Sequence, residues 1–280
     1  MYELYWKLKE KPFENTPDLR FLYHSPKHEE ALFRMLYAIK ERKPAALLTG
    51  ECGSGKTLLS RVLLAELAQQ RYQSAIIFNP KVNSLELLRE ITYQLGINNP
   101  SSVTKIELLH QLNEIFHKNR SEQKDTVIVV DEAQTIDEDS FEELRLLLNF
   151  QLNDNFLLTL ILLGQPELKE KIDRLPNLKQ RFSVRYHLKA LSDKETKEYI
   201  LHRLKVAGAT EEIFLEDAIL EIFRFSAGIP RRINNLCDMA LLVGYGEGIK
   251  KINKEIILKV ACDLEEMAQE EIEDKAKVNG

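Results

Sequence analysis

The sequence predicts an α/β protein in which a parallel sheet of five strands is followed by a smaller, all-helical domain. Three observations support this fold class. Short apolar runs alternate with stretches of helical periodicity through about the first 190 residues, as in parallel α/β sheets. A Gly-rich loop joins the first apolar run to a helical stretch. From residue 192 onward the pattern is helical and contains no strand-like run.

The predicted strands are short and almost continuously apolar. They span residues 45–49, 74–79, 126–130, 157–163 and 184–188. The third run reads Val-Ile-Val-Val over its last four residues, without polar alternation. Such runs are expected where helices cover both faces of a sheet. We therefore expect the parallel sheet to lie between two layers of helices.

The C-terminal third has four stretches of helical pattern, at 193–206, 215–226, 230–244 and 254–265. Ser192 with Glu195 forms a capping box at the start of the first stretch, so we place the domain boundary near Ala190. The expected parts are an α/β domain at 1–190, a helical domain at 191–266 and an acidic tail at 267–280. We interpret the acidic residues at 263–274 as a solvated helix end.

The composition excludes several classes of protein. The chain has 280 residues, of which 44% are hydrophobic and 30% charged, and its net charge of −5 provides no general attraction for nucleic acid. Cys52, Cys237 and Cys262 show neither CxxC pairing nor the spacing of a zinc site. The longest apolar stretch, 157–163, is too short to span a bilayer, and the N-terminus has charged residues where a signal sequence would have its apolar region. We expect a cytoplasmic protein.

Residues 50–57 read Gly-Glu-Cys-Gly-Ser-Gly-Lys-Thr, a Walker A phosphate loop between a strand and a helix. The glycines let backbone N–H groups wrap phosphate oxygens. Lys56 supplies a cation for those oxygens, and Thr57 a hydroxyl for Mg²⁺. The candidate nucleotide-binding residues here are Gly50, Glu51, Cys52, Gly53, Ser54, Gly55, Lys56, Thr57 and Leu58. The alternative is an ordinary Gly-rich turn.

A second pattern follows about 75 residues later, where the strand at 126–130 ends in Asp131 and Glu132. This is the form of a Walker B element, in which Asp131 holds Mg²⁺ through water and Glu132 polarises the attacking water. Carboxylates at a strand end also serve as helix N-caps. The phosphate loop upstream favours the functional interpretation, and the presence of both carboxylates favours hydrolysis over binding alone.

Several further residues are candidates for contact with the γ-phosphate. Gln165 follows the next predicted strand and can align the water or sense the phosphate, although a surface glutamine is also common there. Arg181 precedes the last predicted strand and Arg185 lies near its start. Arg181 is the first choice and Arg185 the second for an arginine supplied to a neighbouring subunit. Either could instead form a plain ion pair. Pro230 starts a helix and projects Arg231 from its first turn, with Arg232 as the alternative.

Other short motifs accompany these patterns. They are the N-terminal Met-Tyr-Glu-Leu-Tyr-Trp, Pro12-Phe13, Thr16-Pro17-Asp18, Phe21-Leu22-Tyr23, His28-Glu29-Glu30-Ala31-Leu32, Asp131-Glu132-Ala133-Gln134, Gly164-Gln165-Pro166-Glu167-Leu168, Gln180-Arg181 and Gly228-Ile229-Pro230-Arg231. Over about residues 1–265 the sequence thereby resembles an AAA+ ATPase. Within that superfamily it is similar to the general secretion pathway ATPases of the ExeA/GspA type.

This resemblance implies a P-loop NTPase with a five-stranded sheet, a helical lid, ATP and Mg²⁺ as cofactors, and a site between subunits of a ring. It also implies that the N-terminal segment lies near adenine, with Phe13, Tyr23 and His28 as candidate contacts of the base. Core packing is the alternative for Phe13 and Tyr23. Cys52 stands where relatives have a small aliphatic residue, and we interpret it as a hydrophobic substitute rather than a redox switch.

The expected function is ATP hydrolysis by a homo-oligomer, with an arginine finger in trans, that assists assembly of a secretion or type IV pilus-like machine. Full-length secretion ATPases of this type continue into a transmembrane helix and a peptidoglycan-binding domain. These 280 residues stop soon after the predicted lid, so we do not expect direct contact with the cell wall, and we expect any association with the inner membrane to run through a partner protein. Shorter relatives occur in pilus biogenesis loci.

Two alternatives stay open. A DNA-binding ATPase of the transposition-regulator class would need a local basic patch, for which Lys81 with Lys105 and Arg231 with Arg232 are the candidates. A scaffold that binds ATP without turnover is disfavoured by the intact pair of carboxylates at the end of the Walker B strand.

Overall fold

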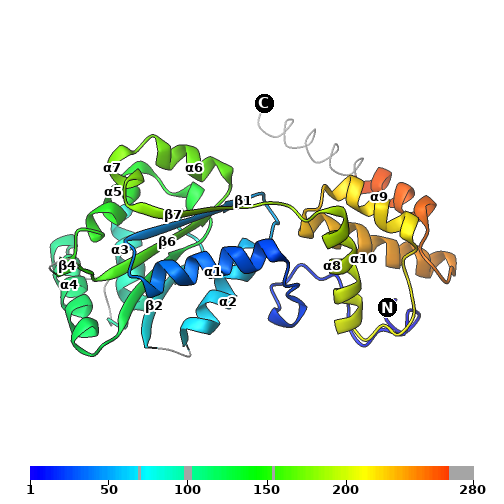
Figure 1. The fold of residues 1–280 in the computed structure, drawn as a ribbon, viewed down its shortest axis with the longest axis horizontal. Helices are drawn as coiled ribbons and strands as arrows, with labels where there is room; N and C mark the ends of the chain where they lie inside the picture. The colour runs from blue at the N-terminus through cyan, green and yellow to red at the C-terminus, as the bar shows by residue number, and fades with distance from the viewer. Residues whose placement is uncertain (69–70, 98–102, 153–154, 265–280) are drawn as a thin grey trace. The chain divides into compact units, whose positions relative to one another are not determined.

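The computed structural model describes residues 1–68, 71–97, 103–152 and 155–264. These residues form two compact units (Figure 1). The sheet unit is Pro26–Lys189, and the helical unit combines Met1–Ser25 with the described chain from Ala190 onward. The expected acidic tail at 267–280 lies outside the described residues. Among the described helices, none combines the length and apolar character needed to cross a membrane.

The sheet unit contains the expected parallel five-stranded sheet, in the order β2-β3-β6-β1-β7. Its strands are β1 (Ala45–Gly50), β2 (Tyr72–Ile77), β3 (Asp125–Val130), β6 (Leu158–Gly164) and β7 (Phe182–Leu188). The predicted strand bounds therefore differ from the observed ones by at most two residues. A short antiparallel pair, β4 (Gln151–Leu152) with β5 (Asn155–Phe156), was not expected.

Helices cover both faces of this sheet (Figure 1). On one face lie α1 (Pro26–Lys40) and α2 (Lys56–Ala68). On the other lie α3 (Ser84–Gln94), α4 (Lys105–Ser121), α5 (Glu138–Leu147), α6 (Pro166–Asp173) and α7 (Pro176–Lys179). Successive strand residues alternate between the two cores, so every residue of β1 and β6 is buried. The continuous apolar runs follow from this double burial.

The register of the strands brings their carboxyl ends to one edge of the sheet. Thr49 of β1 lies opposite Gly164 of β6, and Val130 of β3 lies opposite Leu162 of the same strand. The segments that follow β1, β3 and β6 are therefore neighbours. In open parallel sheets this edge is where ligands bind.

The helical unit is built from α8 (Asp193–Val206), α9 (Glu216–Ser226), α10 (Pro230–Glu247) and a helix over 254–264. The expected capping box of Ser192 and Glu195 is formed at the start of α8. The helices enclose one apolar core that includes Ile200, Phe214 and Cys237. Burial raises the pKa of the Cys237 thiol well above its usual range, so this cysteine is an inert packing residue.

The first 25 residues, which include the 3₁₀ turn η1 (Leu19–Phe21), pack on these helices and belong to the same core. Trp6 Nε1 donates a hydrogen bond of 2.9 Å to the carbonyl oxygen of Leu241. The buried Arg203 guanidinium donates to the carbonyl oxygens of Pro12, at 2.5 Å, and Glu14, at 2.9 Å. The N-terminal segment is thus held on the helical unit by buried polar contacts as well as by apolar packing.

Candidate active site at the carboxyl edge of the sheet

The loop between β1 and α2 has the backbone that a phosphate loop requires. Gly53 and Gly55 have φ angles of 79° and 102°, a region that side chains rarely adopt. Gly50 has no room for a side chain, because a Cβ atom would lie 2.9 Å from the carbonyl oxygen of Leu188. The glycines predicted from the sequence are therefore each required by the observed geometry.

Lys56, the first residue of α2, is buried beneath this loop. Its Nζ donates hydrogen bonds to the carbonyl oxygens of Gly50, at 2.8 Å, and Glu51, at 3.0 Å. Burial lowers the pKa of the Lys56 ammonium. A phosphate placed at this helix N-terminus would favour the charged form, so the site is electrostatically suited to an anion.

Asp131 follows β3 and is almost completely buried. Burial raises the pKa of its carboxyl, whereas hydrogen bonds from the Thr57 side chain and from the Glu132 N–H, at 2.9 Å, favour the carboxylate. A carboxylate and a hydroxyl in mutual contact are the hard oxygen donors that Mg²⁺ prefers. Thr57 and Asp131 therefore fit the proposed metal position.

Glu132 has a left-handed backbone, with φ of 51° and ψ of 33°, which is uncommon for a residue other than glycine. Its carboxylate accepts a 2.6 Å hydrogen bond from Nε2 of Gln134. The Oε1 of the same Gln134 accepts a 3.1 Å hydrogen bond from the backbone N–H of Gln165. Gln134 was not among the predicted site residues, because only the three-dimensional structure shows where its side chain points.

Gln165 follows β6 and caps the start of α6 without a hydrogen bond from its side chain to the helix. Since β6 lies between β1 and β3, Gln165 is beside both the phosphate loop and the Walker B carboxylates. The structure therefore brings together Lys56, Thr57, Asp131, Glu132 and Gln165 at one edge of the sheet.

The three candidate base contacts lie in different surroundings. His28, in α1, is buried with Nε2 3.0 Å from the carbonyl oxygen of Ser54, next to the phosphate loop. Phe13 is buried in the core of the helical unit, where it meets Phe214 edge-on at 6.1 Å between ring centroids. Tyr23 belongs to the same unit, and its hydroxyl donates a 2.5 Å hydrogen bond to Glu198.

Arg181 lies just before β7, at the amino edge of the sheet, since β7 begins opposite Ala45. Its guanidinium donates a 2.9 Å hydrogen bond to Asn149 and lies over the ring of Phe156. The amino and carboxyl edges are separated by the length of a strand, about 3.3 Å per residue. Arg181 is therefore remote from the phosphate loop of its own chain.

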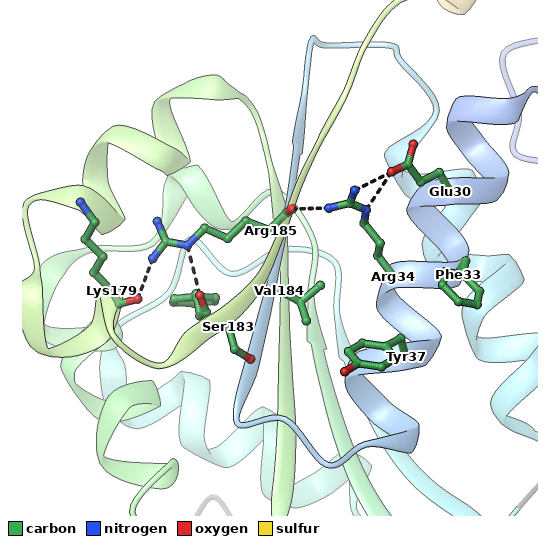
Figure 2. A pocket seen from close by; sticks show the side chains of 9 residues that line it. Glu30, Phe33, Arg34, Tyr37, Lys179, Ser183, Val184 and Arg185 are labelled. Carbon is green, nitrogen blue, oxygen red and sulfur yellow. Dashed lines mark hydrogen bonds and ion pairs between the residues drawn. The ribbon is translucent and has the colours of Figure 1, made fainter.

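Arg185, within β7, lines an open groove between α1 and the edge of the sheet (Figure 2). Its guanidinium donates hydrogen bonds to the carbonyl oxygens of Lys179, at 2.6 Å, and Phe182, at 3.2 Å. Its own carbonyl oxygen accepts a 3.3 Å hydrogen bond from Arg34 of α1 (Figure 2). The Arg185 guanidinium is thus already hydrogen-bonded to two carbonyl oxygens of its own chain.

The remaining candidates lie on the surfaces of the two units. Pro230 occupies the first turn of α10, and Arg231 and Arg232 next to it are exposed. Of the two lysines in the predicted basic patch of the sheet unit, Lys105 forms a 2.5 Å ion pair with Glu143. Cys52, in the phosphate loop, is exposed.

Comparisons with known proteins agree with this geometry. Residues 39–172 match the family described as AAA domain. The chain also matches the fold of Cdc6p from Pyrobaculum aerophilum, with 18% identity, a TM-score of 0.66, and coverage of 83% of this chain and 67% of the other. The chain has the AAA+ P-loop NTPase fold. The fold predicted from the sequence is confirmed.

One sequence match and one further structural match agree with this fold. Over 254 residues, 90% of this chain, the sequence is 37% identical to "General secretion pathway protein A" of Aeromonas hydrophila. The chain covers 46% of that protein, so it spans about half the length of this curated relative. The ORC1 protein of Aeropyrum pernix, solved in complex with DNA, has 17% identity and a TM-score of 0.68, over 92% of this chain and 70% of the other. The predicted similarity to the general secretion pathway proteins of this type is confirmed.

Proposed function

We propose that this AAA+ chain binds ATP with Mg²⁺ at its phosphate loop and hydrolyses it. The observation that carries this proposal is the meeting of three strand ends, which places Lys56, Thr57, Asp131, Glu132 and Gln165 around one position. A cation for the phosphates, oxygen ligands for a metal and a carboxylate for water are the parts that phosphoryl transfer to water requires.

Each residue has a separate task in this proposal. Lys56 and the loop N–H groups bind the phosphate oxygens, and the hydroxyl of Thr57 and the carboxylate of Asp131 hold the metal. A bound Mg²⁺ neutralises charge that builds up on the phosphates. Glu132 orients and polarises the attacking water from its fixed carboxylate, while Gln165 contacts the γ-phosphate side of the site. His28, packed on the phosphate loop, is our first candidate for a contact near the base.

We further propose that the active form is a homo-oligomer in which Arg181 reaches the phosphates of a neighbouring subunit. Its position at the amino edge of the sheet supports this, because it is remote from its own phosphate loop. Arg185 is the second candidate, although its side chain is already bound to two carbonyl oxygens. Arg231, in the first turn of α10, remains our candidate for a further contact of the γ-phosphate.

The proposed role of hydrolysis is to assist assembly of a secretion or type IV pilus-like machine, on the cytoplasmic side and through a partner protein. The 37% identity to General secretion pathway protein A supports this role. A DNA-bound ATPase is the second candidate, favoured by the fold similarity to an ORC1 protein in complex with DNA. The net charge of −5 and the pairing of Lys105 with Glu143 count against it.

The experiment measures ATP turnover against protein concentration, with and without double-stranded DNA, beside light scattering with a slowly hydrolysed ATP analogue. Specific activity that rises with concentration, ignores DNA and follows oligomer formation supports the assembly ATPase. Strong stimulation by DNA together with filament-sized particles supports the second candidate. The Lys56→Ala variant supplies the background rate in both arms.

A further inference from the structure

The Gln134 side chain connects the Walker B glutamate to the segment after β6. Its Nε2 donates a 2.6 Å hydrogen bond to the carboxylate of Glu132, and its Oε1 accepts a 3.1 Å hydrogen bond from the N–H of Gln165. Both ends of the amide are used with the correct polarity. Turning the amide over would place an N–H against an N–H and an oxygen against a carboxylate, so the orientation is fixed chemically.

Gly164, the last residue of β6, leaves room for the Gln134 amide because it has no side chain. At Gly164 a Cβ atom would lie 2.7 Å from Oε1 of Gln134, closer than any real Cβ contact. The backbone around Gln134 is also anchored, since Lys171 Nζ donates to the carbonyl oxygens of Gln134, at 2.6 Å, and Ile136, at 3.1 Å. The 3₁₀ turn η3 (Ala133–Thr135) is therefore tied to α6 by its backbone as well as by the Gln134 side chain.

The other end of this link is equally constrained. The left-handed backbone of Glu132 is held by Thr135, whose N–H and hydroxyl donate to the Glu132 carbonyl oxygen at 3.0 and 2.8 Å. A non-glycine residue in this conformation persists where its surroundings enforce it. The Glu132 carboxylate is linked to the Gln165 backbone through the single side-chain amide of Gln134.

We propose that Gln134 is a positioning residue that couples Glu132 to the β6–α6 turn, so that a displacement of Gln165 is transmitted to the carboxylate that orients water. This rests on the proposed ATPase function, in which Gln165 contacts the γ-phosphate side. Through this coupling, the alignment of the Glu132 carboxylate depends on whether Gln165 contacts the γ-phosphate side of the site. In this proposal the Gln134 side chain contacts neither the nucleotide nor the attacking water.

The test is Gln134→Met, which keeps the length of the side chain and removes both hydrogen bonds. We expect kcat to fall about tenfold or more, while the dissociation constant for ATP changes less than about twofold. The matched control is Gln73→Met on β2, where a half-buried amide donates a 2.7 Å hydrogen bond to the carbonyl oxygen of Leu95, far from the site. This control leaves both constants unchanged.

A double-mutant cycle with Glu132→Gln then separates positioning from an independent role. If Gln134 acts through Glu132, adding Gln134→Met to Glu132→Gln lowers the residual rate by less than about twofold. Multiplied losses, or an unchanged kcat in Gln134→Met, overturn the coupling while leaving the ATPase proposal intact. Absence of turnover in the wild-type protein overturns both. Circular dichroism and ATP affinity confirm that each variant is folded.

Discussion

The ammonium group of Lys56 donates a hydrogen bond of 2.8 Å to the carbonyl oxygen of Gly50, the residue that ends β1. A second bond, of 3.0 Å, reaches the carbonyl oxygen of Glu51. The cation is thereby held under the loop and its pKa is lowered by burial. Neutral carbonyl oxygens are weaker partners for an ammonium than phosphate oxygens, so the site gains electrostatically when phosphates bind.

Lys56→Ala should therefore weaken ATP binding strongly. A hydrogen bond to a charged group contributes about 1.5–3 kcal/mol, which corresponds to a loss of about tenfold to a hundredfold in affinity. Isothermal titration calorimetry measures this directly. Lys118→Ala, an exposed lysine of α4, is the control and should bind ATP normally. Wild-type affinity in Lys56→Ala would refute the assignment of the phosphate loop.

Gly164→Ala should lower the stability of the folded protein. The added Cβ would lie 2.7 Å from Gln134 Oε1 and 2.7 Å from Leu168 Cδ2, so the packing must shift. Overpacking of this kind costs about 1–3 kcal/mol in the free energy of unfolding. Gly246→Ala, in α10 with nothing within 4 Å of the new atom, should instead stabilise the helix. Urea unfolding compares the two, and equal effects would contradict the described packing.

Arg181→Ala should bind ATP normally and hydrolyse it poorly if Arg181 acts on a neighbouring subunit. A mixture of Arg181→Ala with Lys56→Ala should regain activity, because the second variant lends its arginine to the intact phosphate loop of the first. Arg145→Ala, which removes a surface pair with Glu142 on α5, serves as the control. If the mixture stays inactive, Arg181 acts in its own chain or supports the structure.

His202 should make the helical unit less stable in mild acid. Burial, followed by the charges of His24 and Arg203, lowers the pKa of its imidazole. The unfolded chain, with a histidine pKa of about 6.5, then binds a proton more readily than the folded chain. The free energy of unfolding therefore falls as the pH drops through about 6.5 toward the folded value. Thermal melts between pH 8 and 5 should show a smaller acid loss for His202→Gln, and parallel losses would exclude His202 as the source.

The sheet was predictable because a strand that is buried on both faces needs an uninterrupted apolar run, as from Val127 to Val130. The strand with the largest offset, β2, lies at the edge of the sheet. It begins with Tyr72 and Gln73, which are half-buried, and Gln73 uses its side chain to reach the carbonyl oxygen of Leu95. Its ends are not marked by apolar residues alone, so the predicted strand was displaced toward the more apolar residues that follow.

The site was predictable where chemistry dictates residue type in a local motif, as for Lys56 and Asp131. Gln134 could not be recognised in that way. Its role depends on the left-handed backbone at Glu132 and on the open space at Gly164, and both are features of the three-dimensional structure that a local motif does not show. The packing of the first 25 residues on the helical unit also depends on distant contacts, such as that between Arg203 and Pro12.

The proposed hydrolysis is tested most simply by measuring phosphate release from ATP by the wild-type protein and Glu132→Gln, at saturating ATP with Mg²⁺. We expect Mg²⁺-dependent release by the wild type. We also expect a rate lower by about a hundredfold or more in Glu132→Gln, which should still bind ATP normally and accumulate as oligomers. Undiminished release by Glu132→Gln would mean that another residue positions the water, and would contradict the proposed site.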